Sequence, residues 1–211
     1  MQRQTTPSSE GAAIINTGTA PDGTVEHVPF TTTGLTRVST WRAQAIAFLR
    51  ISFGVVWGIA TGLKWQPKFI DSFSDQVTGA KDGQAPLVQN WISFWGNIIS
   101  ANPHFYAYLI ASIETALAVF FIFGILTNLT AVVSIIYSLG IWSIAEGFGG
   151  PIQPGKSTDV GTAFVYALLA GTLLAIAAGR YFGVDRWLSP RLGRLSILAS
   201  GPVSFRRRRT L

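Results

Sequence analysis

The sequence predicts an all-α membrane protein: a four-transmembrane-helix bundle with an additional short interfacial helix and a disordered N-terminal tail. Charged residues make up only 12% of the 211 residues, about half the share found in a typical soluble domain. Apolar runs recur along the chain, and several are long enough to cross a bilayer as helices. Clusters of glycine, proline and polar residues separate these runs, as expected for the connections between helices.

The N-terminal region, residues 1–40, is polar and rich in Thr, Ser and Gly. It has no sustained apolar period, which predicts a disordered tail. The first apolar run, at about 45–63, does not directly follow a basic start. We therefore interpret it as a retained span and not as a signal peptide.

The first span contains a single charge, Arg50, and ends at Lys64, Trp65 and Pro67. Basic and aromatic residues of this kind are typical of a membrane boundary. The stretch from Asp71 to Gly83 holds several charges and glycines, so we expect a hydrated connecting loop there.

The segment at about 87–100 predicts a different kind of helix. Its apolar residues, which include two tryptophans, recur at helical spacing, while amides and serines occupy much of the other face. It would be only about 21 Å long as a helix, too short to cross a bilayer. We predict a helix lying in the membrane interface, with a re-entrant segment packed on the bundle as the alternative.

The second and third spans are predicted at about 105–126 and 129–146, joined by a tight connection. The second span has Glu114 near its middle, and Glu146 closes the third. Together with the fourth span these helices form a membrane domain over residues 41–190. Residues 191–211 are expected to form a basic cytoplasmic tail with a short surface helix around 192–198.

The fourth span, at about 160–181, has an uncharged stretch about 30 Å long as a helix, the thickness of the hydrocarbon core. Thr158 or Ser157 could cap its first turn, and Asp159 would lie near the positive end of the helix dipole. Small residues recur at every fourth position, which favours close helix packing. We expect this ridge to make the helix the packing spine of the bundle: Ala163, Ala167, Gly171, Ala175 and Gly179.

The distribution of basic residues predicts the orientation. Of the 16 Lys and Arg residues, most are arginines in the two terminal regions, and four lysines fall in the opposite loops: Lys64, Lys68, Lys81 and Lys156. By the positive-inside rule, both termini are expected in the cytoplasm and the protein in the cytoplasmic membrane as a multi-pass protein.

Two ionisable residues, Arg50 and Glu114, lie within predicted spans. Charges inside a membrane usually face the bundle interior and have partners. The sequence therefore favours an Arg50–Glu114 pair or a shared network. The alternative is that Arg50 extends to the lipid head groups while Glu114 is protonated or bonded locally.

A second group of polar residues is expected where the helices end on the outer side. Antiparallel packing would bring these ends together into a mouth with cations, carboxylates, an imidazole and an indole. A helix N-terminus there would suit an anion, although charged and aromatic residues are common at membrane interfaces anyway. These substrate- or quinone-binding candidates are Lys64, Trp65, His104, Glu146, Lys156, Thr158 and Asp159.

Several function classes are disfavoured. The chain has no cysteine and two histidines, so thiolate metal sites, dithiol relays and haem held by two histidines of the bundle are not expected. No phosphate-binding loop or nucleophile elbow occurs, and no metal site or cofactor on this chain is evident. The basic residues follow a span, so lipid head groups explain them better than nucleic acid.

Three segments resemble the DoxD/DoxX family of small membrane proteins. They are LRISFGVVWGIATGLKW (49–65), TDVGTAFVYALL (158–169) and GRYFGVDRWL (179–188), and the second is similar to the DoxD branch. The resemblance, over roughly 45–190, implies a small membrane subunit of a thiosulfate:quinone oxidoreductase that acts with a second subunit. No catalytic residues come with it.

The resemblance and the residues together give a first hypothesis: a subunit linked to quinone redox chemistry, with thiosulfate as one candidate donor and quinone as substrate. Trp65, Tyr137, Tyr166 and Glu114 are candidates for the quinone contact. The alternative is a non-catalytic assembly or accessory subunit of a respiratory complex. A small transporter with Arg50 and Glu114 in its pathway ranks third.

Overall fold

The computed structural model describes residues 40–151 and 160–200, and within these residues it is helical without a strand. Three of the described helices are long and apolar enough to cross a membrane: α1 (Thr40–Lys64), α4 (Pro103–Phe123) and α5 (Thr127–Ile144). They coincide with the first three predicted spans. The all-helical class and the membrane character are thereby confirmed, while the predicted N-terminal tail lies outside the described residues.

The fourth predicted span is shorter than expected. Helix α6 (Thr162–Ala175) has 14 residues and is apolar. Its length is about 21 Å, less than the hydrocarbon core of about 30 Å. The helix ends because Ala177 has left-handed backbone with φ 50°, after which the chain turns into η2 (Ala178–Arg180). A continuous helix to residue 181 is therefore wrong, and Ser157, Thr158 and Asp159 lie outside the described residues.

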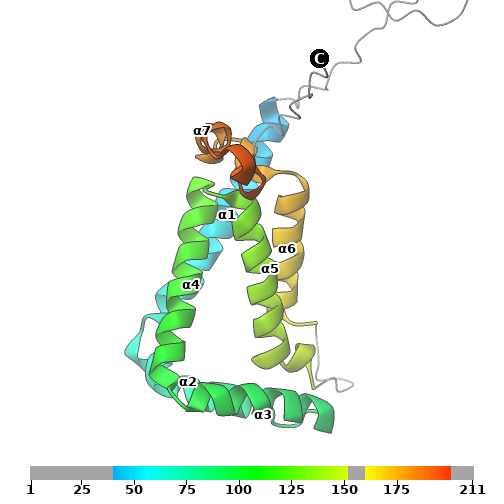
Figure 1. The fold of residues 1–211 in the computed structure, drawn as a ribbon. Coiled ribbons are helices and arrows are strands. Elements are labelled where there is room, and N and C mark those ends of the chain that lie inside the picture. Colours follow the sequence, from blue (N-terminus) through cyan, green and yellow to red (C-terminus); the bar gives the residue numbers. More distant parts are fainter. Residues whose placement is uncertain (1–39, 152–159, 201–211) are drawn as a thin grey trace, which may run out of the picture. The chain divides into compact units, whose positions relative to one another are not determined.

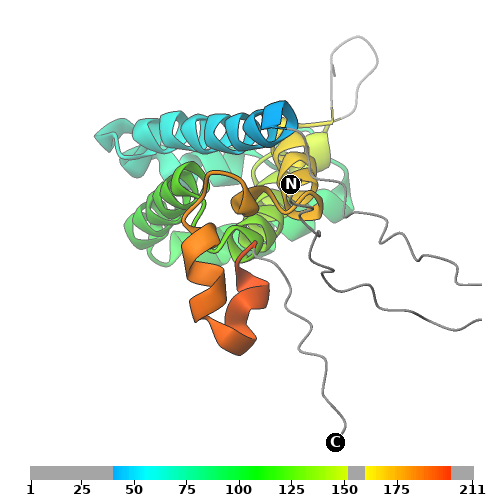
Figure 2. The ribbon, with the colours of Figure 1, turned by 90° about the horizontal axis from the view of Figure 1, so that it is seen from above.

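The long helices pack as two pairs. The most extensive helix contacts are those of α1 with α4 and of α5 with α6, and Figures 1 and 2 show both pairs. An aromatic cluster joins the pairs, because Phe53 and Trp57 of α1 contact Phe121 of α4 and Tyr166 of α6. No single helix is the packing spine.

The predicted small-residue ridge accounts for one of these interfaces in part. Ala163 and Ala167 of α6 are buried, and Gly171 lies close to the Ile135 side chain of α5. Helix α5 also buries small residues, and they recur at helical spacing along one of its faces: Thr127, Thr130, Ala131, Ser134 and Ser138. Small residues on both helices allow the close approach that membrane helices use. Gly179, by contrast, lies in η2 and not on α6.

The prediction of a hydrated loop after the first span is wrong, because most of this segment forms a helix. Helix α2 (Pro67–Gly79) begins with a proline in its first turn, where proline is well tolerated. It buries Ile70, Phe73 and Val77, which lie at helical spacing on one face. The neighbouring Asp71 and Asp75 lie on its exposed face.

The predicted short helix is confirmed as α3 (Pro86–Ser100). Figure 1 shows it running crosswise at the ends of α4 and α5, beside α2. One face packs inward with Ile92 and Ile99, while Leu87, Trp91 and Phe94 are exposed. That crosswise placement and apolar outer face agree with an interfacial helix, which stays a prediction.

The opposite end of the bundle is closed by short helical turns: α7 (Asp185–Leu188), η3 (Ser189–Arg191) and η4 (Gly193–Leu198). The last of them is the short helix expected around 192–198. Residues 201–211 of the predicted basic tail lie outside the described residues.

Arg50 and Asp185 stabilise the end of the bundle at which α7, η3 and η4 lie, because both side chains form hydrogen bonds with backbone groups there. The Arg50 guanidinium donates hydrogen bonds to the carbonyl oxygens of Ala178 (3.3 Å), Tyr181 (3.1 Å) and Phe182 (3.2 Å). Gly124 allows this approach, because a Cβ atom there would overlap the guanidinium and its φ is 63°. Both polar side chains are fully buried, so this end of the bundle is held by charge-assisted hydrogen bonds to the backbone.

Candidate functional site

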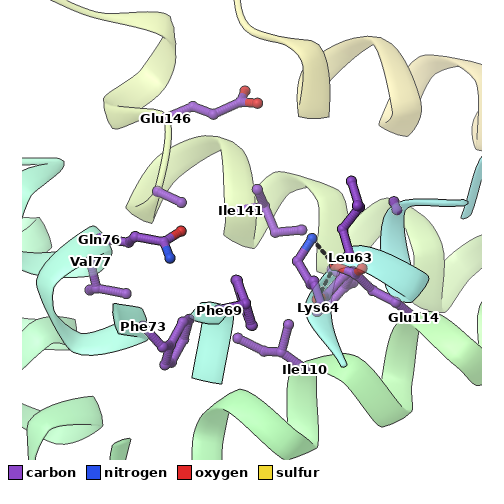
Figure 3. Close-up of a pocket in the computed structure, with 13 residues that line it drawn as sticks. Leu63, Lys64, Phe69, Phe73, Gln76, Val77, Ile110, Glu114, Ile141 and Glu146 are labelled. Atoms are coloured by element: carbon purple, nitrogen blue, oxygen red, sulfur yellow. Dashed lines mark hydrogen bonds and ion pairs between the residues drawn. The ribbon is translucent and has the colours of Figure 1, made fainter. Parts of the chain in front are cut away.

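A cavity of about 510 Å³ lies between the C-terminal end of α1, α2, the middle of α4 and the C-terminal half of α5. Its walls are mostly apolar, and Figure 3 shows the side chains around it. We call it the Glu114 cavity. Its lining is Ala60, Leu63, Lys64, Phe69, Phe73, Gln76, Val77, Ile110, Glu114, Tyr137, Ile141, Ala145 and Glu146.

Glu114 is the polar centre of this cavity, and its side chain is fully buried. Its Oε1 atom lies 3.0 Å from the Lys64 ammonium and accepts a 2.8 Å hydrogen bond from the Tyr137 hydroxyl. Its Oε2 atom is buried and accepts no hydrogen bond from any residue that the structure describes. A mid-span carboxylate is costly without a partner, and Lys64 supplies the compensating charge.

Lys64 joins this centre to the edge of the cavity. Its side chain is 26% exposed, and its ammonium lies 5.6 Å from the centre of the Phe69 ring. Figure 3 shows the amine directed at Glu114. The pair therefore joins a buried carboxylate to a cation that solvent can reach.

The expected direct pair between Arg50 and Glu114 is not formed, because each residue has other partners. The register of α1 against α4 explains this. Thr61 of α1 donates to the carbonyl of Ala111, one turn from Glu114, whereas Gly54 abuts Ile122. Arg50 thus lies opposite the C-terminal end of α4, roughly 16 Å along the helix axis from Glu114. Lys64 is the basic residue at the level of the carboxylate.

The structure brings together part of the predicted outer mouth. Lys64 and Glu146 both line the Glu114 cavity. The Glu146 carboxylate accepts hydrogen bonds at 3.1 Å from the amide of Ala163, near the start of α6. It therefore acts as a cap for that helix, as an acidic group at a helix N-terminus does.

Trp65 and His104 do not line the cavity. The Trp65 indole donates to the Thr115 hydroxyl at 3.0 Å and packs on Tyr108. His104 lies 3.6 Å from Asp71, and both side chains are exposed. Lys156, Thr158 and Asp159 lie outside the described residues, so the expected mouth is described only in part.

Of the two tyrosines named as candidates for the quinone contact, one lines the cavity and the other does not. Tyr137 lines the cavity and bonds Glu114. The Trp57 ring packs against both tyrosines, with centroid distances of 5.8 Å to Tyr137 and 5.2 Å to Tyr166. Tyr166 is therefore a neighbour of the cavity wall and not part of the lining.

Two features were missed in the sequence. One is the wall that α2 contributes through Phe69, Phe73 and Val77; their spacing after Pro67 was the available signal. The other is the role of Asp185, whose oxygens accept from the amides of Leu126 (2.6 Å), Thr127 (2.8 Å) and Ser200 (3.0 Å). The GRYFGVDRWL segment thus contains a residue that caps α5.

The fold and the cavity define a class: an all-helical protein with apolar helices suited to a bilayer, and with a charged pair inside an apolar cavity. No protein-family model matches the chain, and no curated protein or solved structure matches it either.

Proposed function

We propose that this chain is an integral membrane subunit linked to quinone redox chemistry, and that the Glu114 cavity holds the quinone head group. One observation carries the proposal: a fully buried carboxylate, Glu114, pairs with a partly exposed lysine and with a tyrosine in a largely apolar cavity among apolar helices. Ligand pockets combine apolar walls with a few convergent polar groups, and their usual volumes of about 300–1,000 Å³ include this one.

The chemistry of a quinone fits these residues. Its ring and isoprenoid tail need an apolar environment, which the aliphatic and phenylalanine side chains of the cavity provide. Its oxygens exchange hydrogen bonds and protons when the ring is reduced or oxidised, and Lys64, Glu114 and Tyr137 offer such groups. The resemblance to the DoxD branch adds thiosulfate as a candidate electron donor and a second subunit as partner.

We further propose a cytoplasmic-membrane location with four crossings and with both termini in the cytoplasm. Because α6 alone is shorter than the hydrocarbon core, the fourth crossing is proposed to consist of α6 together with the chain that follows it through η2. The bias of arginine towards the terminal regions supports this orientation. Trypsin added to inside-out vesicles is then expected to remove the Arg206–Arg209 block, whereas right-side-out vesicles protect it. Cleavage in right-side-out vesicles alone would reverse the orientation.

The function is tested by purifying the full chain in mild detergent and measuring bound quinone by lipid extraction and mass spectrometry. We expect quinone to co-purify, and Ala60→Phe, which adds a ring to the cavity wall, to reduce it at least tenfold. Asp75→Asn, an exposed change on α2, should leave it unchanged. Wild-type protein without quinone, but with a stable partner subunit, would favour the accessory-subunit alternative.

Thiosulfate-dependent quinone reduction by membranes is the second readout. Activity that is lost in Ala60→Phe would place the reaction at this cavity. Activity that Ala60→Phe leaves intact would contradict the assignment of the quinone site.

A further inference from the structure

The hydrogen bonds of Glu114 are unevenly distributed between its two oxygens. Oε1 already accepts from two donors, the Lys64 ammonium and the Tyr137 hydroxyl. Oε2 is equally buried and accepts none from the described residues. A buried acceptor without a donor is costly and rare in proteins. Glu114 lines the cavity, so a ligand there can supply the missing donor once the side chains that enclose Oε2 move apart.

The Tyr137 hydroxyl has a single proton, which it donates to Oε1. It therefore cannot donate to Oε2 or to a ligand at the same time. Lys64 retains further N–H groups, so it can donate to an acceptor atom in the cavity while it pairs with Glu114. The free positions of the site are thus one strong acceptor, Oε2, beside a cationic donor. A ligand that presents only acceptors would leave Oε2 unsatisfied.

We infer that the Glu114 cavity selects a ligand that donates an O–H group to Glu114 Oε2, namely a hydroxylated aromatic ring of the hydroquinone type. A benzoquinone of the same shape has no such donor, and an O-methylated ring has lost it. The inference rests on the function proposed above, and concerns which redox state of the ligand the cavity binds more tightly.

The surroundings of the pair support an aromatic head group. Phe69 and Phe73 from α2 line the same cavity as Tyr137 from α5. Figure 3 shows Phe69 beside the Lys64–Glu114 pair and Phe73 farther along the cavity wall. A flat ring can pack between such side chains while its hydroxyl reaches the carboxylate. A hydrogen bond to a charged acceptor is among the stronger ones in proteins.

Three probes with one decyl tail test the inference: a decyl-substituted benzohydroquinone, its dimethyl ether and the corresponding benzoquinone. Their affinities for the purified full chain are compared anaerobically at one detergent concentration. We expect the hydroquinone to bind about 10–100-fold more tightly than the ether, the range for one hydrogen bond to a charged group. We expect it also to bind more tightly than the benzoquinone.

Glu114→Gln should reduce the hydroquinone-to-ether ratio to below about threefold, because the neutral amide is a weaker acceptor. Asp75→Asn, which removes an exposed carboxylate from α2, should keep the wild-type ratio. The wild-type comparison needs no variant, so it tests the inference even if Glu114→Gln does not fold.

The outcomes separate this inference from the proposed function. Equal binding of the three probes, blocked by Ala60→Phe, would overturn the donor requirement while leaving the quinone site in place. Tighter binding of the benzoquinone would overturn it as well. Binding of none of the probes would overturn both the inference and the proposed function.

Discussion

Lys64→Met is expected to lower the free energy of unfolding by about 3–5 kcal/mol, because it leaves the Glu114 carboxylate buried without a cation. The Lys64 ammonium lies 3.0 Å from Glu114 Oε1, and among the residues that the structure describes no other basic side chain lines the cavity. The measurement is unfolding of the purified chain by SDS in mixed micelles.

The double variant Lys64→Met/Glu114→Met separates the pair from the general effect of substitution. An apolar replacement of both members of a buried ion pair is often neutral, so we expect most of the lost stability to return. Lys68→Met, an exposed change at the start of α2, is the matched control and should cost little. A small effect of Lys64→Met, or a double variant less stable than either single variant, would contradict the assigned pair.

Asp185→Asn is expected to cost about 2–4 kcal/mol of unfolding free energy. The carboxylate accepts hydrogen bonds from three backbone amides, those of Leu126, Thr127 and Ser200. Hydrogen bonds to a charged acceptor contribute about 1.5–3 kcal/mol each. In asparagine, one oxygen is replaced by an NH₂ group, which cannot accept and would face an amide donor.

The same SDS titration measures this effect, with Asp75→Asn as a control of equal chemistry on an exposed helix face. A further readout is hydrogen exchange at the start of α5, where we expect faster exchange of the Thr127 amide in Asp185→Asn. Unchanged exchange there would show that Asp185 does not cap this helix.

Much of the fold was predictable, because spans are long and their composition is dictated by lipid. The apolar runs that became α1, α4 and α5 could be bounded within a few residues, since local signals mark their ends, such as Pro103 at the start of α4 and Gly124 after its last turn. Helix α2 was missed for the opposite reason. Its apolar face is narrow, and the aspartates on its other face suggested a loop.

Only part of the candidate site was predictable, because Trp65, His104 and Tyr166 were also expected and do not line the cavity. Glu114, Lys64, Glu146 and Tyr137 were all named from their types and positions, and they line one cavity. Their pairing was not predicted. Arg50 and Lys64 are both basic residues of α1, and the choice between them as partner of Glu114 depends on the register of α1 against α4.

The sequence by itself predicted a helical chain with four spans and few charges within them, and three of those spans, α1, α4 and α5, are long and apolar enough to cross a membrane. Those properties follow from composition and period, which are local. The tertiary structure alone decided where α6 ends, that Asp185 caps α5 and that Lys64 pairs with Glu114. These depend on backbone turns near Ala177 and on helix register, which place residues far apart in the sequence within hydrogen-bonding distance.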